Sequence, residues 1–337
     1  MATKEKINNA LEKGIITVDT ANSLKKYNNK LERNNMPIIY NLRHLRKIFK
    51  IKKKEQNKYF GKERGEYHTF YIPKKNGGKR VIEAPSDRLK SIQLWIKENI
   101  LDKINVSANA KGFRKNYSIL DNAKEHVNKD LVINIDLKDF FPSITYNRVY
   151  RIFSYVGYTN EVAHLLTQLC TNKKNVLPQG SPASPAISNI VALKLDKRLG
   201  LLAAKFNCSY TRYADDMTFS GCVGIKNMLS IIEKIIIEEK FLVNAAKVRL
   251  QYKNQRQEVT GLIVNEKITV SQKLIKEIDN AIYYCSKYGV ASHMQKIGCD
   301  KSFYKEHLYG IAYFINMVNK KKGEYYLSKL DEISWLY

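Results

Sequence analysis

Two acidic signals, each at the end of a predicted strand, constrain this sequence more than any other feature. Leu131 to Leu137 is an apolar run with Asp136 near its end, and two short β-like runs flank Asp215 and Asp216 as a hairpin with an acidic tip. If these strands are neighbours, three carboxylates converge. Such a set can hold divalent cations, because hard ions such as Mg²⁺ prefer oxygen ligands. Each signal alone is more often a turn or a helix cap, so the surrounding residues decide the interpretation.

The charge of the chain indicates an anionic partner. Its 337 residues include 58 Lys and Arg against 32 Asp and Glu, and residues 1–90 hold 23 of the basic residues but only 9 of the acidic ones. We expect nucleic acid, because the sequence has no basic amphipathic helix suited to a membrane surface. A merely solubilising surface is the alternative, which the uneven distribution weakens. Without a long apolar run or a secretory signal, no membrane partner and a cytoplasmic location are expected.

The pattern along the chain predicts a mixed α and β fold after a basic N-terminal segment. Residues 1–36 are polar, with apolar positions spaced for one or two short helices. A hairpin is predicted from Tyr67 to Ala84, and the Tyr-rich end from residue 271 is predicted to be mostly helical. The other predicted helices span residues 86–100, 147–156, 161–170, 186–199 and 227–239, and further strands span 258–264 and 267–270.

Three motifs follow one another at separations that fit a single domain. Residues 134–144 read Asn-Ile-Asp-Leu-Lys-Asp-Phe-Phe-Pro-Ser-Ile, residues 177–185 read Leu-Pro-Gln-Gly-Ser-Pro-Ala-Ser-Pro, and residues 213–216 read Tyr-Ala-Asp-Asp. In this order they resemble the first catalytic motif, the template- and nucleotide-positioning loop and the Tyr-x-Asp-Asp box of reverse transcriptases. The resemblance implies an α+β right-hand polymerase fold. Its parts would be a basic helical extension at 1–38, fingers and a palm with an antiparallel sheet at 39–264, and a helical, RNA-binding thumb at 265–337.

Two shorter elements flank these motifs. Asn122-Ala123-Lys124-Glu125-His126 precedes the first motif, and Val259-Thr260-Gly261 follows the box. They match the Asn-Ala-x-x-His and Val-Thr-Gly elements of bacterial retron reverse transcriptases. This resemblance implies an RNA-directed DNA polymerase, a nucleotidyltransferase that copies part of its own structured non-coding RNA with deoxynucleotides. Priming from a guanosine 2′-hydroxyl would give branched multicopy single-stranded DNA (msDNA), and a separate effector protein would join the enzyme in anti-phage defence.

The resemblance also implies roles for single residues. Asp136, Asp215 and Asp216 would hold two Mg²⁺ ions. Phe141 matches the bulky residue that excludes a ribose 2′-hydroxyl, whereas the neighbouring Phe140 fits a core aromatic better.

Five further residues are implied to face the nucleotide. Gln179 and Gly180 would lie beside the incoming nucleotide and template, where a glycine lets the backbone approach closely. Lys79 and Arg80 lie in the predicted hairpin, where the family holds the triphosphate with basic side chains. Lys247 lies where the family places a lysine near the leaving pyrophosphate, and an ordinary surface lysine is the alternative.

The remaining candidates concern RNA. Asn122 and His126 are assigned to RNA contact or to support of the palm, and Val259, Thr260 and Gly261 to a primer-grip hairpin. The region 262–337 contains 9 Tyr among its lysines, which can stack on unpaired bases. Only a minority of them are assigned to RNA, because an apolar set recurs there at helical spacing and indicates core: Leu308, Ile311, Phe314, Ile315 and Val318.

Two other functions stay open at this stage. The chain could be another bacterial defence reverse transcriptase that uses a different template, which the sequence of its DNA product would reveal. It could also serve as a nucleic-acid scaffold that restrains an effector after synthesis. An aspartate variant that still binds RNA but no longer restrains the effector would show that the product, rather than the protein alone, is required.

Overall fold

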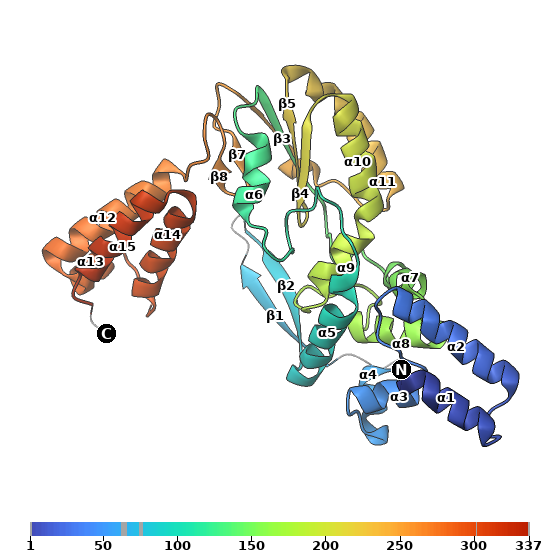
Figure 1. Cartoon of the computed structure of the whole chain (residues 1–337). Helices are drawn as coiled ribbons and strands as arrows, with labels where there is room; N and C mark the ends of the chain where they lie inside the picture. Colours follow the sequence, from blue (N-terminus) through green and yellow to red (C-terminus); the bar gives the residue numbers. More distant parts are fainter. Residues whose placement is uncertain (1, 62–65, 74–76, 301, 336–337) are drawn as a thin grey trace. The chain divides into compact units, whose positions relative to one another are not determined.

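The computed structural model describes residues 2–61, 66–73, 77–300 and 302–335 (Figure 1). The chain forms two compact units, each assembled from separate segments. Unit 1 contains Met1–Arg114, Leu137–Arg198 and Glu233–Val243, and unit 2 contains Lys115–Asp136, Leu199–Ile232 and Asn244–Tyr337. This partition does not follow the chain order, so the sequence-based division at residues 38 and 264 stays a prediction. No helix in the described part of the chain is long and apolar enough to cross a membrane.

Unit 1 is mainly helical and contains one two-stranded hairpin. In the hairpin, Tyr67 pairs with Pro85 and Pro73 with Lys79 in antiparallel register. Ser86 caps the next helix as predicted, because its Oγ accepts a hydrogen bond from the Leu89 backbone N–H at 3.4 Å. The elements are α1 (Ala2–Glu12), α2 (Val18–Arg33), α3 (Leu42–Ile48), α4 (Gln56–Tyr59), β1 (Tyr67–Pro73), β2 (Lys79–Pro85), α5 (Asp87–Asn99), α7 (Tyr146–Val156), α8 (Asn160–Cys170) and α9 (Ser184–Val191).

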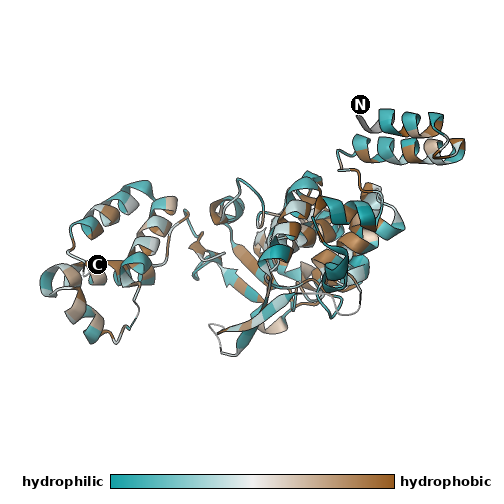
Figure 2. Cartoon of the chain, turned by 90° about the horizontal axis from the view of Figure 1, so that it is seen from below, coloured by the Kyte–Doolittle hydropathy of each residue, from teal (hydrophilic) through white to brown (hydrophobic). Residues whose placement is uncertain are grey.

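The two N-terminal helices predicted from the sequence are α1 and α2, and they carry both hydrophilic and hydrophobic residues (Figure 2). The chain after α2 is connected to the rest of unit 1 by hydrogen bonds between side chains and backbone carbonyls. Asn34 Nδ2 donates to the Val156 carbonyl at 2.8 Å, and the Tyr158 hydroxyl donates to the Pro37 carbonyl at 2.9 Å. The N-terminal segment is therefore an integral part of unit 1.

Two helices contain residues of both units. α10 (Leu193–Lys205) follows α9, and α11 (Leu229–Glu238) follows the acidic hairpin. The sequence predicts one helix over 186–199, and the structure divides this region into α9 and α10, which meet at Ala192. Ala192 keeps right-handed helical angles, with φ −80° and ψ −1°, and its N–H bonds to the Ser188 and Ile190 carbonyls.

Unit 2 is built on a four-stranded antiparallel sheet in the order β4-β5-β3-β6 (Figure 1). Every residue of the inner strand β3 is buried, which explains why the sequence shows a nearly continuous apolar run there. The strands are β3 (Leu131–Asp136), β4 (Ser209–Tyr213), β5 (Asp216–Gly221) and β6 (Arg249–Tyr252), and the short helix α6 (Ile119–Ala123) precedes β3.

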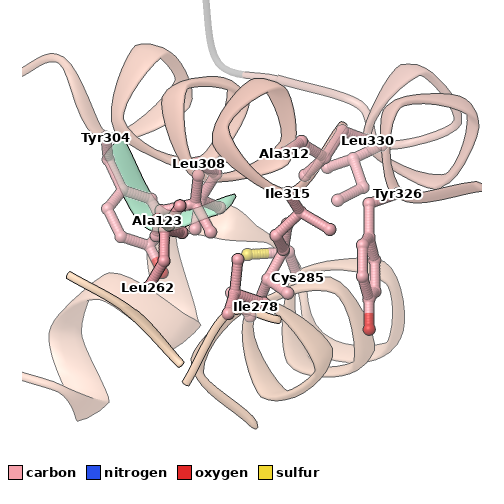
Figure 3. Packing of buried hydrophobic residues seen from close by; sticks show 14 of the residues in the cluster. Ala123, Leu262, Ile278, Cys285, Tyr304, Leu308, Ala312, Ile315, Tyr326 and Leu330 are labelled. Carbon is pink, nitrogen blue, oxygen red and sulfur yellow. The ribbon is translucent and has the colours of Figure 1, made fainter. Parts of the chain in front are cut away.

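The C-terminal part of unit 2 is helical as predicted, and its helices share a core with the strands before it. Ile278, Cys285, Leu308, Ile315 and Leu330 point toward one another in Figure 3 and belong to one buried cluster. The predicted apolar set lies in or against this cluster, with Phe314 and Val318 only partly buried. The elements are β7 (Glu258–Val259), β8 (Leu262–Ile263), α12 (Gln272–Tyr288), α13 (Val290–Lys296), α14 (Tyr304–Val318) and α15 (Lys320–Asp331).

Candidate active site

The register of the sheet brings the three predicted aspartates to one end of unit 2. Asp136 is the last residue of β3 and lies opposite Asp216, the first residue of β5. Asp216 also pairs with Tyr213 at the end of β4, so Ala214 and Asp215 form the turn between the two strands. Convergence of the carboxylates therefore follows from strand pairing.

A buried arginine supports the acidic turn. Ala214 has a positive φ of 59°, a left-handed conformation that is rare for a residue with a side chain. Arg212 is fully buried, and its Nη1 donates to the Ala214 carbonyl at 3.0 Å. This bond satisfies a carbonyl of the strained turn and helps to fix the backbone that carries Asp215 and Asp216.

Asp136 is held by two side chains from the segment just before β6. Asn244 Nδ2 donates to Asp136 Oδ1 at 2.9 Å, and Lys247 Nζ lies 2.9 Å from Oδ2. The Asn244 backbone N–H also donates to the Asp136 carbonyl at 2.8 Å. Lys247 was predicted from the sequence to face pyrophosphate, and here it forms an ion pair with an aspartate. The sequence interpretation missed Asn244, although a polar residue directly after the apolar run Phe241-Leu242-Val243 was an available signal.

The three carboxylates influence one another. Partial desolvation, then repulsion from Asp215 and Asp136, raises the pKa of Asp216 to about 6, although Lys247 and Arg249 oppose the shift. Asp216 is exposed, so its desolvation is incomplete, and repulsion by the two neighbouring carboxylates contributes to the shift. A divalent cation bound among these oxygens would relieve that repulsion, and carboxylate oxygens are ligands that hard cations take.

The described residues contain no ready-assembled group of three His, Cys, Asp or Glu side chains that could hold a metal ion. The donor chemistry at the end of the sheet fits a hard divalent ion. One oxygen of Asp136 is bound to the Lys247 ammonium.

The three named residues of the Asn-Ala-x-x-His element, Asn122, Ala123 and His126, are buried in unit 2, whereas Lys124 and Glu125 between them are exposed. The His126 side chain bridges two strands, with Nδ1 2.7 Å from the Ser220 hydroxyl on β5 and Nε2 2.7 Å from the Thr211 hydroxyl on β4. Asn122 is also buried, and its Nδ2 donates to Thr260 Oγ1 at 3.4 Å. These positions favour the support role over direct RNA contact, because neither side chain reaches the surface.

The Val-Thr-Gly element forms the tight turn of the β7–β8 hairpin. Thr260 and Gly261 both have positive φ, 48° and 85°, which is the requirement of a two-residue type I′ turn. Val259 is fully buried in the same cluster as Ala123, so it cannot touch primer or RNA in this conformation. The single strand predicted over 258–264 is therefore a hairpin of its own. Thr260 is partly exposed and Gly261 exposed, and their primer contact stays a prediction.

The positioning loop packs against β2 in unit 1. The Glu83 backbone N–H donates to the Gln179 carbonyl at 2.9 Å. Gly180 has φ 142°, and a Cβ at this position would lie 2.6 Å from the Glu83 carbonyl oxygen. Packing within the protein thus already requires glycine here, and the nucleotide contacts of both residues stay predictions.

The two adjacent phenylalanines differ in burial. Phe140 is 3% exposed and packs on Phe241 with the ring centroids 5.6 Å apart, so its interpretation as core is confirmed. Phe141 is only partly buried, and the centroid of its ring lies 6.0 Å from the centroid of the Phe113 ring. An aromatic ring held at its side but partly open to solvent fits the role of a steric filter.

Lys79 and Arg80 begin β2 and are both exposed. The Lys79 ammonium lies 5.8 Å from the centroid of the Tyr71 ring on β1. Residues 74–76 of the predicted basic turn lie outside the described residues. Two solvent-facing cations on a hairpin are available to an anionic ligand, and their contact with triphosphate stays a prediction.

The C-terminal tyrosines divide into two groups. Tyr304 and Tyr326 are buried, whereas Tyr283, Tyr288 and Tyr313 are more than half exposed. Tyr283 borders a groove of about 450 Å³ between α12 and α15, which Lys287 and Tyr325 also line. The structure thus leaves part of the tyrosines on the surface, and their stacking on RNA bases stays a prediction.

Comparison with known proteins assigns the family. A family model described as reverse transcriptase (RNA-dependent DNA polymerase) matches residues 72–265. The retron Ec86 reverse transcriptase of Escherichia coli is 34% identical over 309 residues, which cover 88% of this chain and 91% of that protein. The chain belongs to the retron reverse transcriptases. The family is thus the predicted one, and the enzyme is an RNA-directed DNA polymerase that uses an RNA template and nucleotides.

Two further similarities are more limited in coverage or in fit. The retron Mx162 reverse transcriptase of Myxococcus xanthus is 34% identical over 302 residues, covering 79% of this chain and 61% of its own length. Among solved structures, the telomerase of Candida albicans, in complex with a fragment of telomeric RNA, matches at a TM-score of 0.45 and 10% identity, covering 90% of this chain and 58% of its own. A TM-score of this size adds nothing to the family assignment.

Proposed function

We propose that the enzyme copies part of a structured non-coding RNA into branched msDNA, using two Mg²⁺ ions held by Asp136, Asp215 and Asp216. The observation that carries the proposal is the contact between the two short retron elements, where Asn122 donates to Thr260 across 138 residues of sequence. Each element alone is too short to be distinctive. Their joint packing beside the sheet that carries the aspartates supports a shared function in the retron reaction.

The chain's own residues suit the parts of this reaction. When bound, the cations would polarise the attacking hydroxyl and neutralise charge on the leaving pyrophosphate. Asp136, Asp215 and Asp216 supply the anionic oxygens at the end of the sheet, and Arg212 fixes the turn that presents two of them. Lys79 and Arg80 would bind the triphosphate, and the exposed tyrosines near Lys287 would stack on unpaired bases of the RNA.

We also propose that the enzyme and its msDNA act with a separate effector protein in anti-phage defence. The high positive charge of the chain, +26, supports a lasting complex with nucleic acid. The effector would then recognise a nucleoprotein particle rather than the protein alone.

The test is a denaturing gel of the nucleic acid that co-purifies with the enzyme expressed beside its native upstream DNA. We expect a discrete DNA that shortens after treatment with debranching enzyme and that is missing from the Asp215→Asn variant. A linear DNA of other sequence would indicate a reverse transcriptase with a different template. RNA that co-purifies equally with both proteins, without any DNA, would favour the scaffold.

Replacing Phe141 with alanine is expected to raise the use of ribonucleotides relative to deoxynucleotides by about 10- to 100-fold. The reason is that removing the ring opens space for a 2′-hydroxyl, and size discrimination in a pocket is typically of this order. The measurement is kcat/KM for each nucleotide on a primed RNA template. Phe303→Ala removes a well exposed ring elsewhere in the chain and should leave the ratio unchanged. An unaltered ratio in Phe141→Ala would assign selectivity to another residue.

A further inference from the structure

The carboxylate of Asp136 has a partner on each oxygen, and the two partners differ in kind. Asn244 is a neutral donor at 2.9 Å from Oδ1, and Lys247 is a cation at 2.9 Å from Oδ2. The Asp136 side chain is only 10% exposed, whereas that of Lys247 is 52% exposed. One partner of this nearly buried carboxylate can therefore be reached from solvent.

The two partners also differ in how firmly they are held. Asn244 contacts Asp136 twice, through its side chain and through its backbone N–H, so its position is fixed relative to the end of β3. Lys247 follows in a short 3₁₀ turn, Ala245–Lys247, and reaches Asp136 only through the end of its flexible stem. Asn244 can stay while the Lys247 ammonium leaves.

Charge at the end of the sheet favours such an exchange. Asp216 experiences repulsion from Asp215 and Asp136, and Lys247 and Arg249 oppose it. A divalent cation would compensate three carboxylates better than one ammonium does. It would also need an oxygen of Asp136, and the ammonium and the cation would repel each other at short range.

We propose that a divalent cation, when it binds, displaces the Lys247 ammonium from Oδ2 of Asp136, while Asn244 stays and positions the carboxylate. This inference rests on the proposed role of Asp136 as a metal ligand. It leaves the released ammonium free for the pyrophosphate-facing role that the family resemblance implies for Lys247.

The test measures the affinity of the full chain for Mn²⁺ without nucleotide or RNA, by the electron paramagnetic resonance signal of free Mn²⁺. Lys247→Met removes the competing cation and should lower the Kd for Mn²⁺ about tenfold. The expected change is no larger because the Lys247 side chain is half exposed, and solvent screens its charge. Asn244→Ala leaves Asp136 without its fixed donor and should raise the Kd. Lys253→Met, an exposed lysine just after β6 at the opposite end of that strand, is the matched control and should bind like wild type.

A second readout separates competition from a general change in the protein. Without metal, Lys247→Met should melt at a lower temperature than wild type, since three carboxylates lose a neutralising partner. Saturating Mn²⁺ should raise its melting temperature by more than that of wild type, because at a given Mn²⁺ concentration the stabilisation of the folded state grows with the logarithm of the affinity. Lys247→Gln, which keeps a donor but no charge, should behave similarly.

Each outcome has a defined meaning. An unchanged or higher Kd for both Lys247 variants would overturn the exchange. Asp136→Asn distinguishes this failure from a failure of the proposed site. If Asp136→Asn weakens Mn²⁺ binding while the Lys247 variants do not tighten it, the metal site stands and the exchange is wrong. If Asp136→Asn binds Mn²⁺ like wild type, Asp136 is not a ligand and the proposed function itself loses its metal site.

Discussion

Asp136→Asn is expected to lower DNA synthesis on a poly(rA) template with an oligo(dT) primer by about a thousandfold or more. Loss of one anionic oxygen ligand removes charge stabilisation aimed at the reacting phosphate, and effects of this size are typical of such groups. The substitution keeps the shape of the side chain, and Asn244 can still donate to the remaining oxygen. The measurement is the initial rate of labelled dTTP incorporation at saturating Mg²⁺.

The fold of this variant should be intact. Lys247 loses its partner, but an ammonium that is half exposed is well solvated, so the cost is small. Removing one of three mutually repelling carboxylates acts in the opposite direction on stability. We therefore expect an unchanged far-ultraviolet circular dichroism spectrum. Asp130→Asn, an exposed aspartate directly before the other end of β3, should polymerise like wild type. More than a tenth of wild-type activity in Asp136→Asn would remove Asp136 from the catalytic set.

Gly323→Ala is expected to destabilise the enzyme by about 3 kcal/mol, because of a close contact between two helices. A Cβ on Gly323 would lie 2.1 Å from Cα and 2.6 Å from the backbone nitrogen of Asn316. Backbone atoms cannot rotate away as the end of a side chain can, so α14 and α15 would have to separate. The cause is the connection between them: Asn319 alone joins Val318 to Lys320, which forces the helices together at once.

Gly310 provides the matched control for this substitution. It lies exposed within α14, and a Cβ there would meet nothing within 4 Å. Gly310→Ala should therefore stabilise the protein by about 0.5–1 kcal/mol through the unfolded chain and helix propensity. Thermal unfolding followed by circular dichroism should show shifts of opposite sign for the two variants. A Gly323→Ala variant with the same melting temperature as wild type would contradict the close packing of α14 on α15.

Sequence periodicity and motif order predicted much of the fold. The buried run before Asp136, the hairpin at 67–84, the Ser86 cap and the helical C-terminal region all appear in the structure. These features depend on local alternation, capping and burial, which neighbouring residues determine. Two elements differ in their bounds: the helix predicted over 186–199 is divided between α9 and α10, and the strand predicted over 258–264 is the β7–β8 hairpin.

The sequence predicted some residues of the candidate site correctly, left the role of others open and missed one. Asp136, Asp215 and Asp216 were found because their motifs carry them, and strand pairing then explains why they meet. His126 and Asn122 were found as sequence elements, but only their burial against Ser220, Thr211 and Thr260 indicates that they support the fold. Asn244 was missed, because a polar residue after an apolar run is a signal of position only and does not reveal a partner more than a hundred residues earlier.

By itself, the sequence determined the family, the three aspartates and the order of helices and strands, because motifs and periodicity are written in consecutive residues. Only the tertiary structure decided what each of these residues touches. It showed that Lys247, whose pyrophosphate contact stays a prediction, forms an ion pair with Asp136. It also showed that Gly180 and Gly323 lie close to the backbones of Glu83 and Asn316, where a Cβ would not fit. Such contacts join segments far apart in the chain, and their geometry depends on how strands and helices pack together rather than on local preference.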